Sequence, residues 1–364
     1  MADSGTIRIL IMAGGTGGHV YPALAVADCL RAQSVKVNWL GTRAGLEARV
    51  VPPAGFKLHT IAVSGLRGKG AAGWLLAPLR LSGALLQAAW ILLRLRPHAV
   101  LGMGGFVSGP GGVAAWLLRR PLLIHEQNAV AGLTNRLLAR LAGKVMAAFP
   151  GAFRKASMVE ITGNPVRESI GRLPAPAERF GARRGRLNLL VIGGSLGALA
   201  LNQILPPAVA NFDAAHRPHV WHQTGAGKLA ATRADYQALG VEAKVVEFIE
   251  DMDAAYAWAD LVICRAGALT ISELALAGVG AILVPYPHAV DDHQSANAGF
   301  LVRAGAAKLL PQAQLSADSL YEMLAGLMKK GRRGLLKMAL AARGAAMPEA
   351  TRVVAQRCLE AARG

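Results

Sequence analysis

Two short apolar runs in this sequence each end in a glycine-rich loop that is followed by a helical stretch. Residues 7–12 precede Gly14-Gly15-Thr16-Gly17-Gly18-His19, and residues 189–192 precede Gly193-Gly194-Ser195-Leu196-Gly197. Glycine lets backbone N–H groups approach an anion closely, and the N-terminus of the following helix adds partial positive charge. The two loops therefore predict a phosphate-binding site in each half of the chain, as in two nucleotide-binding domains.

Apolar runs alternate with helical stretches along the whole chain. This alternation is typical of a parallel sheet with helices on its faces. We therefore predict an α/β fold of two Rossmann-like domains with parallel sheets facing a cleft. The expected strands lie near residues 7–12, 35–40, 98–101, 121–124, 144–148, 159–162, 188–192, 218–222, 244–248, 261–264 and 281–284. The expected helices include residues 21–32, 134–142, 253–259, 270–277 and 348–362.

The length of 364 residues also favours two domains of ordinary size. Residues 171–187 are rich in proline, glycine and arginine and lack an apolar period, which indicates a linker. Polar or glycine clusters follow nearly every expected strand, as in Gly102-Met103-Gly104-Gly105 and His125-Glu126-Gln127-Asn128. Ligands of open α/β sheets bind at the carboxyl ends of the strands, so we expect one binding crevice in each domain.

The net charge of +18 is concentrated in the first half, where Glu126 is the only acidic residue between Glu47 and Glu160. A surface of one sign can meet nucleic acid or an anionic bilayer. Aromatic residues make up 5% of the chain and do not interleave with the bases, which disfavours single-stranded nucleic acid. Glycine and proline interrupt the long apolar runs and no signal peptide is recognisable, so we expect a cytoplasmic protein without a transmembrane helix.

The stretch from Trp74 to Leu93 is strongly apolar but contains arginines. One interpretation is a buried core helix. The other is a helix at a membrane interface, where Trp74, Leu75, Leu79 and Arg80 would contact lipid.

Spacing excludes several common sites. Gly15-Thr16-Gly17 lacks the third glycine of a dinucleotide fingerprint, and the second expected strand ends in Trp39-Leu40-Gly41-Thr42 without an acidic residue. Gly68-Lys69-Gly70 and Gly227-Lys228-Leu229 lack the Ser or Thr of a Walker loop. The three cysteines are scattered and show no metal-like spacing, which indicates a reducing compartment and no zinc site.

Two residues of the first half are candidates for proton transfer. His19 follows the first glycine loop, where a helix N-terminus disfavours imidazolium, and a neutral imidazole can act as a general base toward an alcohol. The alternative is a histidine that only caps the helix. Glu126 is either a site residue or the counter-charge that keeps a basic half folded.

Two acidic positions of the second half have alternative roles. Asp251-Met252-Asp253 resembles a metal-binding Asp-x-Asp, but the simpler interpretation is that Asp253 caps a helix. Thr270 and Glu273 match a capping box, and Glu273 could instead accept hydrogen bonds from a ribose diol.

Six motifs occur in order between the first expected strand and about Ala307. They are residues 14–19, 102–112, 125–128, Gly163-Asn164-Pro165-Val166-Arg167, Gly193-Gly194-Ser195 and residues 264–270. Together they closely resemble the MurG family of bacterial N-acetylglucosaminyltransferases, which convert lipid I to lipid II. The resemblance implies a glycosyltransferase-B fold, with an acceptor- and membrane-binding domain at 1–165 joined by a C-terminal helix at 346–364, and a UDP-sugar-binding domain at 166–345.

The resemblance also implies partners and location. The donor would be UDP-N-acetylglucosamine, and the acceptor would be the undecaprenyl-diphosphate-linked muramyl-pentapeptide. The protein would lie peripherally on the cytoplasmic face of the bacterial inner membrane, bind its anionic surface and bind no nucleic acid. No cofactor is expected, and a divalent metal is not obligatory.

Site residues are carried over by position. Ser195 would hold the donor diphosphate, Arg167 and the Ile249 backbone the uracil region, and Glu273 the ribose. Gly14, Gly15, Gly104 and Gly105 would hold the acceptor diphosphate. The remaining contacts with UDP-N-acetylglucosamine would come from Thr16, Gly17, Gly18, Asn128, Ala268, Leu269, Thr270, His293 and Gln294.

The residues and the resemblance lead to one mechanism. A base, with His19 first and Glu126 second, deprotonates the acceptor C4 hydroxyl, which attacks the anomeric carbon with inversion while UDP leaves. The helix behind Gly193 would stabilise the leaving diphosphate. Three alternatives stay open at this point: a UDP-N-acetylglucosamine epimerase, a glycosyltransferase with another lipid acceptor, and a non-catalytic nucleic-acid-binding protein.

Overall fold

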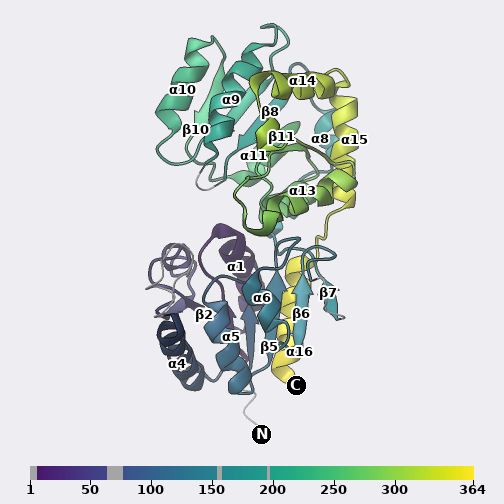
Figure 1. The fold of residues 1–364 in the computed structure, drawn as a ribbon. Helices are drawn as coiled ribbons and strands as arrows, with labels where there is room; N and C mark the ends of the chain where they lie inside the picture. Colours follow the sequence, from purple (N-terminus) through teal and green to yellow (C-terminus); the bar gives the residue numbers. More distant parts are fainter. Residues whose placement is uncertain (1–5, 64–76, 154–157, 195–196) are drawn as a thin grey trace. The chain divides into compact units, whose positions relative to one another are not determined.

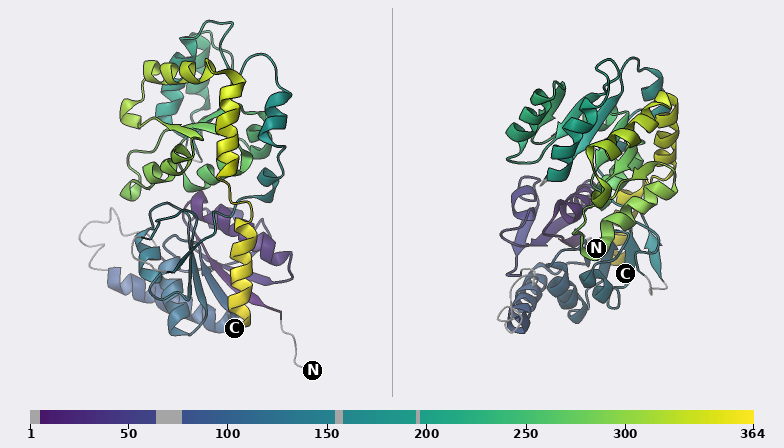
Figure 2. Two further views of the ribbon diagram at one scale, coloured as in Figure 1. Left: turned by 90° about the vertical axis from the view of Figure 1, so that its right-hand side faces the viewer. Right: turned by 45° about the horizontal axis from the view of Figure 1, so that its top comes forward.

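The computed structural model describes residues 6–63, 77–153, 158–194 and 197–364 of the chain. The chain forms two compact units, Met1–Val166 with Pro348–Gly364 and Arg167–Met347 (Figure 1). The boundaries lie within two residues of those expected from sequence. In the first unit the C-terminal helix α16 (Ala350–Arg363) packs against helix α1 (Gly17–Arg31) and the sheet (Figure 2).

The first unit is built on a seven-stranded parallel sheet of order β3-β2-β1-β4-β5-β6-β7. Side chains of a strand alternate between its faces, so Ile9 and Ile11 pack with α1 and α16, whereas Leu10 and Met12 face the core beneath α4 and α5. The strands are β1 (Arg8–Met12), β2 (Lys36–Gly41), β3 (Lys57–Thr60), β4 (Ala99–Gly102), β5 (Leu122–Glu126), β6 (Lys144–Ala147) and β7 (Val159–Ile161). The other helices are α2 (Glu47–Val50), α4 (Ala77–Leu95), α5 (Ser108–Leu117) and α6 (Leu133–Leu138).

The second unit repeats this architecture with a six-stranded parallel sheet of order β10-β9-β8-β11-β12-β13. Its strands are β8 (Asn188–Ile192), β9 (His219–Gln223), β10 (Ala243–Val246), β11 (Leu261–Cys264), β12 (Gly280–Leu283) and β13 (Ala307–Leu309). Its helices are α7 (Glu168–Gly171), α8 (Pro176–Gly181), α9 (Leu199–Ala210), α10 (Leu229–Ala238), α11 (Met252–Trp258), α12 (Ala268–Ala277), α13 (His293–Arg303), α14 (Ala317–Met328) and α15 (Gly331–Gly344), with short 3₁₀ turns at Val290–Asp292 and Gln312–Gln314.

Both sheets reverse their strand order at the first strand of the unit. β1 lies between β2 and β4, and β8 lies between β9 and β11. Ligands of such sheets bind at the carboxyl ends of the strands where the order reverses. The two glycine-rich loops follow β1 and β8, so each loop lies at the switch point of its own unit.

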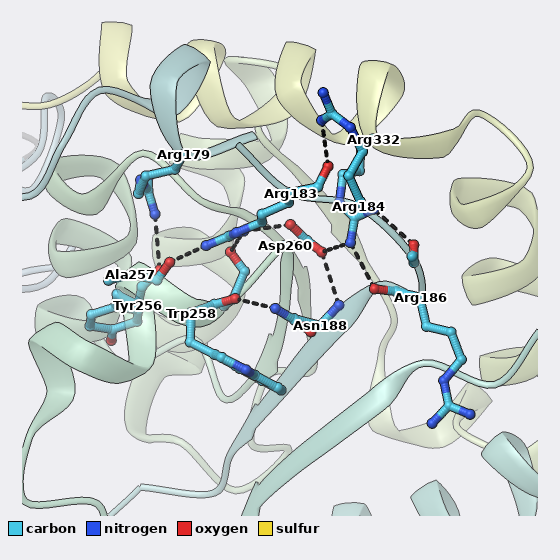
Figure 3. Close-up of polar contacts among 12 residues, drawn as sticks. Arg179, Arg183, Arg184, Arg186, Asn188, Tyr256, Ala257, Trp258, Asp260 and Arg332 are labelled. Atoms are coloured by element: carbon cyan, nitrogen blue, oxygen red, sulfur yellow. Dashed lines mark hydrogen bonds and ion pairs between the residues drawn. The ribbon is translucent and has the colours of Figure 1, made fainter. Parts of the chain in front are cut away.

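The prediction that residues 171–187 form a linker is wrong. This segment belongs to the second unit, and its arginines bind the ends of other elements (Figure 3). Arg179 donates to the carbonyls of Tyr256 (2.9 Å) and Gly278 (2.8 Å). Arg183 pairs with the fully buried Asp260, whose second oxygen accepts from Arg332 (3.1 Å). The arginines that made this segment look like a linker in fact donate hydrogen bonds to backbone carbonyls and to one buried carboxylate.

One ion-pair cluster ties the C-terminal helix to the first sheet. Arg357 on α16 donates from Nε and Nη2 to the Glu160 carboxylate on β7 at 2.7–3.0 Å, and Lys144 Nζ lies 2.9 Å from the same carboxylate. The hydrogen bonds from Arg357 lower the pKa of Glu160 to about 2. A lowered pKa in the folded state stabilises the fold above the ordinary value of 4.5, and that contribution is lost as the pH falls toward 2.

We therefore expect Glu160→Gln to lower stability at neutral pH by about 1–2 kcal/mol, after allowance for solvent screening. The melting temperature should fall by roughly 2–8 °C. Thermal melts at several pH values would show the difference from the unaltered protein shrinking as the pH drops below about 4.5. Glu349→Gln, which breaks an exposed pair with Arg352, is the control. An equal loss in both variants would refute the assignment.

Candidate functional site

The first glycine loop is held in place by a buried carboxylate. Glu47 is fully buried and accepts hydrogen bonds from the Gly15 amide (3.0 Å) and from the amide and hydroxyl of Thr42 (both 2.8 Å). A Cβ atom at Gly14 would lie 2.7 Å from Glu47 Oε1. The Gly15 amide therefore faces a carboxylate and not an anion site, which corrects its expected role. Glu47 was not singled out from the sequence, where nothing links it to residue 15.

The amides at the start of α1 remain suited to an anion. Thr16 is the N-cap residue, its side chain makes no capping bond, and Gly17 and Gly18 open the helix. The first N–H groups of a helix have no carbonyl partner within it. Of the first loop, Thr16, Gly17 and Gly18 thus keep the geometry expected of a phosphate-binding turn.

In the loop after β4, Gly104 and Gly105 allow His19 and the Gly14 backbone to approach closely. Gly104 has a φ of +99°, and a Cβ atom there would lie 2.6 Å from Nδ1 of His19. A Cβ atom at Gly105 would lie 2.2 Å from the Gly14 carbonyl oxygen. The Gly104 amide donates to the Ser108 hydroxyl (3.2 Å), so this amide is not presented to a diphosphate as the family resemblance implied. Gly104 instead leaves room for His19.

His19 and Glu126 lie in different surroundings. His19 is half-buried in the first turn of α1, and its Nδ1 lies 2.8 Å from Gln127 Oε1. Glu126 is buried at the end of β5, and its carboxylate accepts from both nitrogens of Asn128, from the Gly132 amide and from Asn135 Nδ2 at 2.8–3.2 Å. The Glu126 carboxylate thus organises the loop from 126 to 135. Asn128 lies in this loop.

In the second unit, Glu273 lies with Arg167 and Tyr256. Its side chain is in the second turn of α12 and accepts from the Tyr256 hydroxyl (3.0 Å), while Arg167 Nη2 lies 3.6 Å from its other oxygen. Burial raises the pKa of Glu273, and Arg167 opposes the rise. Helix α12 begins at Ala268 with Gly267 as N-cap, so Thr270 is no cap and the capping-box alternative is wrong.

The other expected donor contacts lie at the carboxyl edge of the same sheet. Ala268, Leu269 and Thr270 form the first turn of α12 after β11. Ile249 lies in the loop after β10. His293 and Gln294 open α13, and Gln294 Oε1 accepts from the Tyr286 amide (2.8 Å). 

The backbone just before His293 is strained. Asp291 and Asp292 have φ values of +54° and +48°, a region that residues with a Cβ atom rarely adopt. Such strain often accompanies ligand-binding turns.

Two glycines of the second glycine loop, Gly193 and Gly197, pack closely against neighbouring backbone. A Cβ atom at Gly197 would lie 2.0 Å from the Thr224 carbonyl, and one at Gly193 would lie 2.5 Å from the Ala198 amide. The buried Gln223 donates to the carbonyls of Gly194 and Glu247 (3.0 and 3.1 Å). Ser195 lies outside the described residues.

The acidic pair at 251–253 caps a helix, but through the other residue. Asp251, not Asp253, is the N-cap of α11, and its Oδ1 accepts from the Ala254 amide at 2.9 Å. In the ranges that the structure describes, no group of three His, Cys, Asp or Glu side chains is placed to hold a metal ion.

Helix α4 has one buried and one exposed apolar face. Ala84, Ala88 and Leu92 pack into the core, whereas the opposite stripe is exposed and carries Leu79, Leu86, Trp90 and Leu93. Arg80 is exposed beside this stripe, and the Arg94 guanidinium lies 5.4 Å from the Trp90 ring centroid. The interpretation as a fully buried core helix is wrong. Trp74 and Leu75 lie outside the described residues, and no described helix has the length and hydropathy to cross a membrane.

Comparison with known proteins covers both units. Residues 9–147 match the glycosyltransferase family 28 N-terminal domain, and residues 188–354 match its C-terminal domain. A Nitrosococcus oceani protein named UDP-N-acetylglucosamine--N-acetylmuramyl-(pentapeptide) pyrophosphoryl-undecaprenol N-acetylglucosamine transferase is 58% identical over 98% of this chain and 99% of its own length. A protein of the same name from Neisseria meningitidis is 54% identical over 97% of this chain and 98% of its own length.

Solved structures show the same fold. The crystal structure of Acinetobacter baumannii MurG covers 97% of this chain and 99% of its own, with 42% identity and a TM-score of 0.85. UDP-GlcNAc 2-epimerase from Neisseria meningitidis covers 97% of this chain and all of its own at a TM-score of 0.67, but with 13% identity. The second likeness concerns the fold alone.

Proposed function

This chain belongs to glycosyltransferase family 28, and we propose that it transfers N-acetylglucosamine from UDP-N-acetylglucosamine to lipid I, giving lipid II. It is a hexosyltransferase with the glycosyltransferase-B fold. The observation that carries the proposal is the 58% identity over 98% of the chain with a relative of that printed activity. The acceptor atom in our proposal is the C4 hydroxyl of the muramyl sugar.

The donor is proposed to bind the second unit. Glu273 would accept from the ribose hydroxyls, because Arg167 supports its negative charge and Tyr256 fixes one of its oxygens. The uracil would lie against the Ile249 backbone and Arg167, and the sugar against the first turns of α12 and α13. The loop around Ser195 and the N-terminus of α9 would hold the diphosphate, so we propose that no divalent metal is obligatory.

His19 is our candidate for the general base. It lies beside the amides that open α1 and is oriented by one side-chain hydrogen bond. Glu126 is the weaker candidate, because four N–H donors already surround its carboxylate. Removal of the C4 hydroxyl proton by His19 would let that oxygen attack the anomeric carbon with inversion while UDP leaves.

A transfer assay tests the proposed activity directly. The protein is incubated with UDP-[¹⁴C]N-acetylglucosamine and lipid I, and the lipid fraction is counted. A parallel incubation without acceptor is analysed for the C2 epimer of the donor sugar. Label in lipid that depends on lipid I supports the proposal. Epimer formation without lipid labelling would favour the epimerase, and labelling of diacylglycerol instead would favour another lipid acceptor.

We also propose that the protein binds the anionic inner surface of the bacterial membrane through α4 and that it binds no nucleic acid. Residues 79, 86, 90 and 93 recur at helical spacing on one face of this helix, and the described bases nearby include Arg80 and Arg94. Apolar side chains would enter the interface while basic side chains meet lipid phosphates.

Leu79→Glu combined with Leu86→Glu is expected to release most of the protein from anionic vesicles. The two side chains are 73% and 70% exposed, so the fold should tolerate the change. Binding is measured by sedimentation with phosphatidylglycerol vesicles at low and high salt, since salt screens only the charge contribution. Leu239→Glu with Leu340→Glu, on the second unit, is the matched control. Equal retention of both double variants would exclude α4 as the membrane contact.

A further inference from the structure

Three hydrogen bonds link His19 to a backbone carbonyl through two buried side chains. Gln127 Oε1 lies 2.8 Å from His19 Nδ1, and Gln127 Nε2 lies 3.1 Å from His125 Nδ1. His125 Nε2 in turn lies 2.9 Å from the Gly163 carbonyl oxygen, in the loop after β7. His125 and Gln127 are 0% and 1% exposed, so water does not compete for the hydrogen bond between them or for the bond from His125 to the Gly163 carbonyl oxygen.

The donor and the acceptor of each bond follow from the last member of the series, the Gly163 carbonyl oxygen. A carbonyl oxygen only accepts, so the proton of His125 lies on Nε2. Burial lowers the pKa of His125 to about 4 despite the neighbouring Glu126 charge, so the ring is neutral at pH 7 and its Nδ1 only accepts. Nδ1 therefore takes its hydrogen bond from the amide NH₂ group of Gln127.

The orientation of the Gln127 amide is settled by a second acceptor. Its Nε2 also lies 3.2 Å from the carbonyl oxygen of His125. If the amide were flipped, Gln127 Oε1 would take the place of Nε2. This one acceptor would then face two others, the His125 carbonyl oxygen and His125 Nδ1, and no hydrogen bond could form with either. Gln127 Oε1 consequently faces His19, and His19 must donate from Nδ1.

We propose that His125 and Gln127 are positioning residues that hold His19 in its Nδ1–H tautomer, so that its lone pair is on Nε2. Nε2 then takes the proton of the acceptor hydroxyl, which rests on the proposed role of His19 as base. We call this series of hydrogen bonds from His19 through Gln127 and His125 to the Gly163 carbonyl the relay. It fixes the histidine tautomer as a carboxylate beside a catalytic histidine does, but through a neutral amide. The missing Cβ of Gly104 keeps the space beside Nδ1 open.

The tautomer can be measured without any variant. Uniformly ¹⁵N-histidine-labelled protein is examined by two-bond ¹H–¹⁵N correlation NMR at pH 7.5, and the His19 ring is assigned by comparison with the spectrum of His19→Ala. We expect a protonated Nδ1 and an unprotonated Nε2. A His19 ring protonated on Nε2 alone would overturn the proposal.

Two substitutions test the relay itself. Gln127→Met keeps the length of the side chain but removes both amide groups, so His19 should lose its preference for Nδ1–H. Turnover should fall on the order of tenfold, with an unchanged KM for UDP-N-acetylglucosamine. Gln127→Glu restores an acceptor for His19 Nδ1, so it should recover the tautomer and part of the turnover, while His125 should become protonated to pair with the new carboxylate.

The outcomes separate this relay from the base assignment. Full turnover in His19→Ala would show that His19 is not the base. The proposed Nδ1–H tautomer of His19 would still be tested separately by the NMR measurement. If Gln127→Met left the His19 tautomer unchanged, the relay would be refuted whatever the turnover. The relay would also be refuted if Gln127→Met and Gln127→Glu lost the Nδ1–H tautomer and the turnover to the same extent. Melting temperatures would first show that both variants are folded.

Discussion

His19→Ala is expected to lower turnover by about a hundredfold or more while UDP still binds. The reason is that a general base acts on the acceptor hydroxyl, whereas most of the residues proposed to bind UDP belong to the second unit. Initial rates with lipid I give turnover, and isothermal titration gives UDP affinity. His216→Ala, which changes an exposed histidine of the second unit, is the control and should behave as the unaltered protein.

If turnover and UDP affinity fell together in His19→Ala, the prediction would be wrong. His19 would then maintain the structure of its loop, and the base would be another group. Glu126→Gln would then be examined, although its carboxylate is already bound by four donors.

Glu273→Gln is expected to weaken UDP binding at least tenfold. A neutral amide loses the charge-assisted hydrogen bonds to ribose, each worth about 1.5–3 kcal/mol. It also loses the attraction to Arg167, while the Tyr256 hydroxyl can still donate to the amide oxygen. Titration calorimetry measures the affinity. Glu168→Gln, an exposed position paired with Arg172, is the matched control and should bind UDP normally.

The same variant should not melt at a lower temperature. Burial raises the pKa of Glu273 in the folded protein, so its protonated form favours folding, and this stability is lost as the pH rises through the folded-state pKa. Glutamine cannot ionise and avoids that cost at neutral pH. Unchanged UDP affinity, or a melting temperature that falls together with the affinity, would make Glu273 a structural residue.

Sequence patterns predicted most of the fold because the strongest local signals are also the buried ones. Eleven apolar runs correspond to strands of the two sheets, and the glycine loops follow β1 and β8 as expected. The strands that were missed, β3 and β13, are edge strands. Lys57, His59 and Thr60 interrupt the apolar pattern of β3, and Lys308 interrupts that of the three-residue β13.

Local patterns failed where a residue's partner is distant in the sequence. The arginines of residues 171–187 looked like those of a linker, because the carbonyls and the Asp260 carboxylate that they bind lie about 70–100 positions further along the chain. Thr270 and Glu273 had the spacing of a capping box, but the helix begins at Ala268 and Glu273 turns to Arg167 and Tyr256 instead.

The order of the residues was enough to place polar and charged groups just after the predicted strands, and so to single out His19, Glu126 and Glu273 as site candidates. What each of these residues can do depends on partners that folding brings to it. Gln127 meets His19 across 108 positions, and Glu47 meets Gly15 across 32. A hydrogen bond depends on the distance and direction between two atoms, and for segments this far apart only the packing of strands and loops sets both.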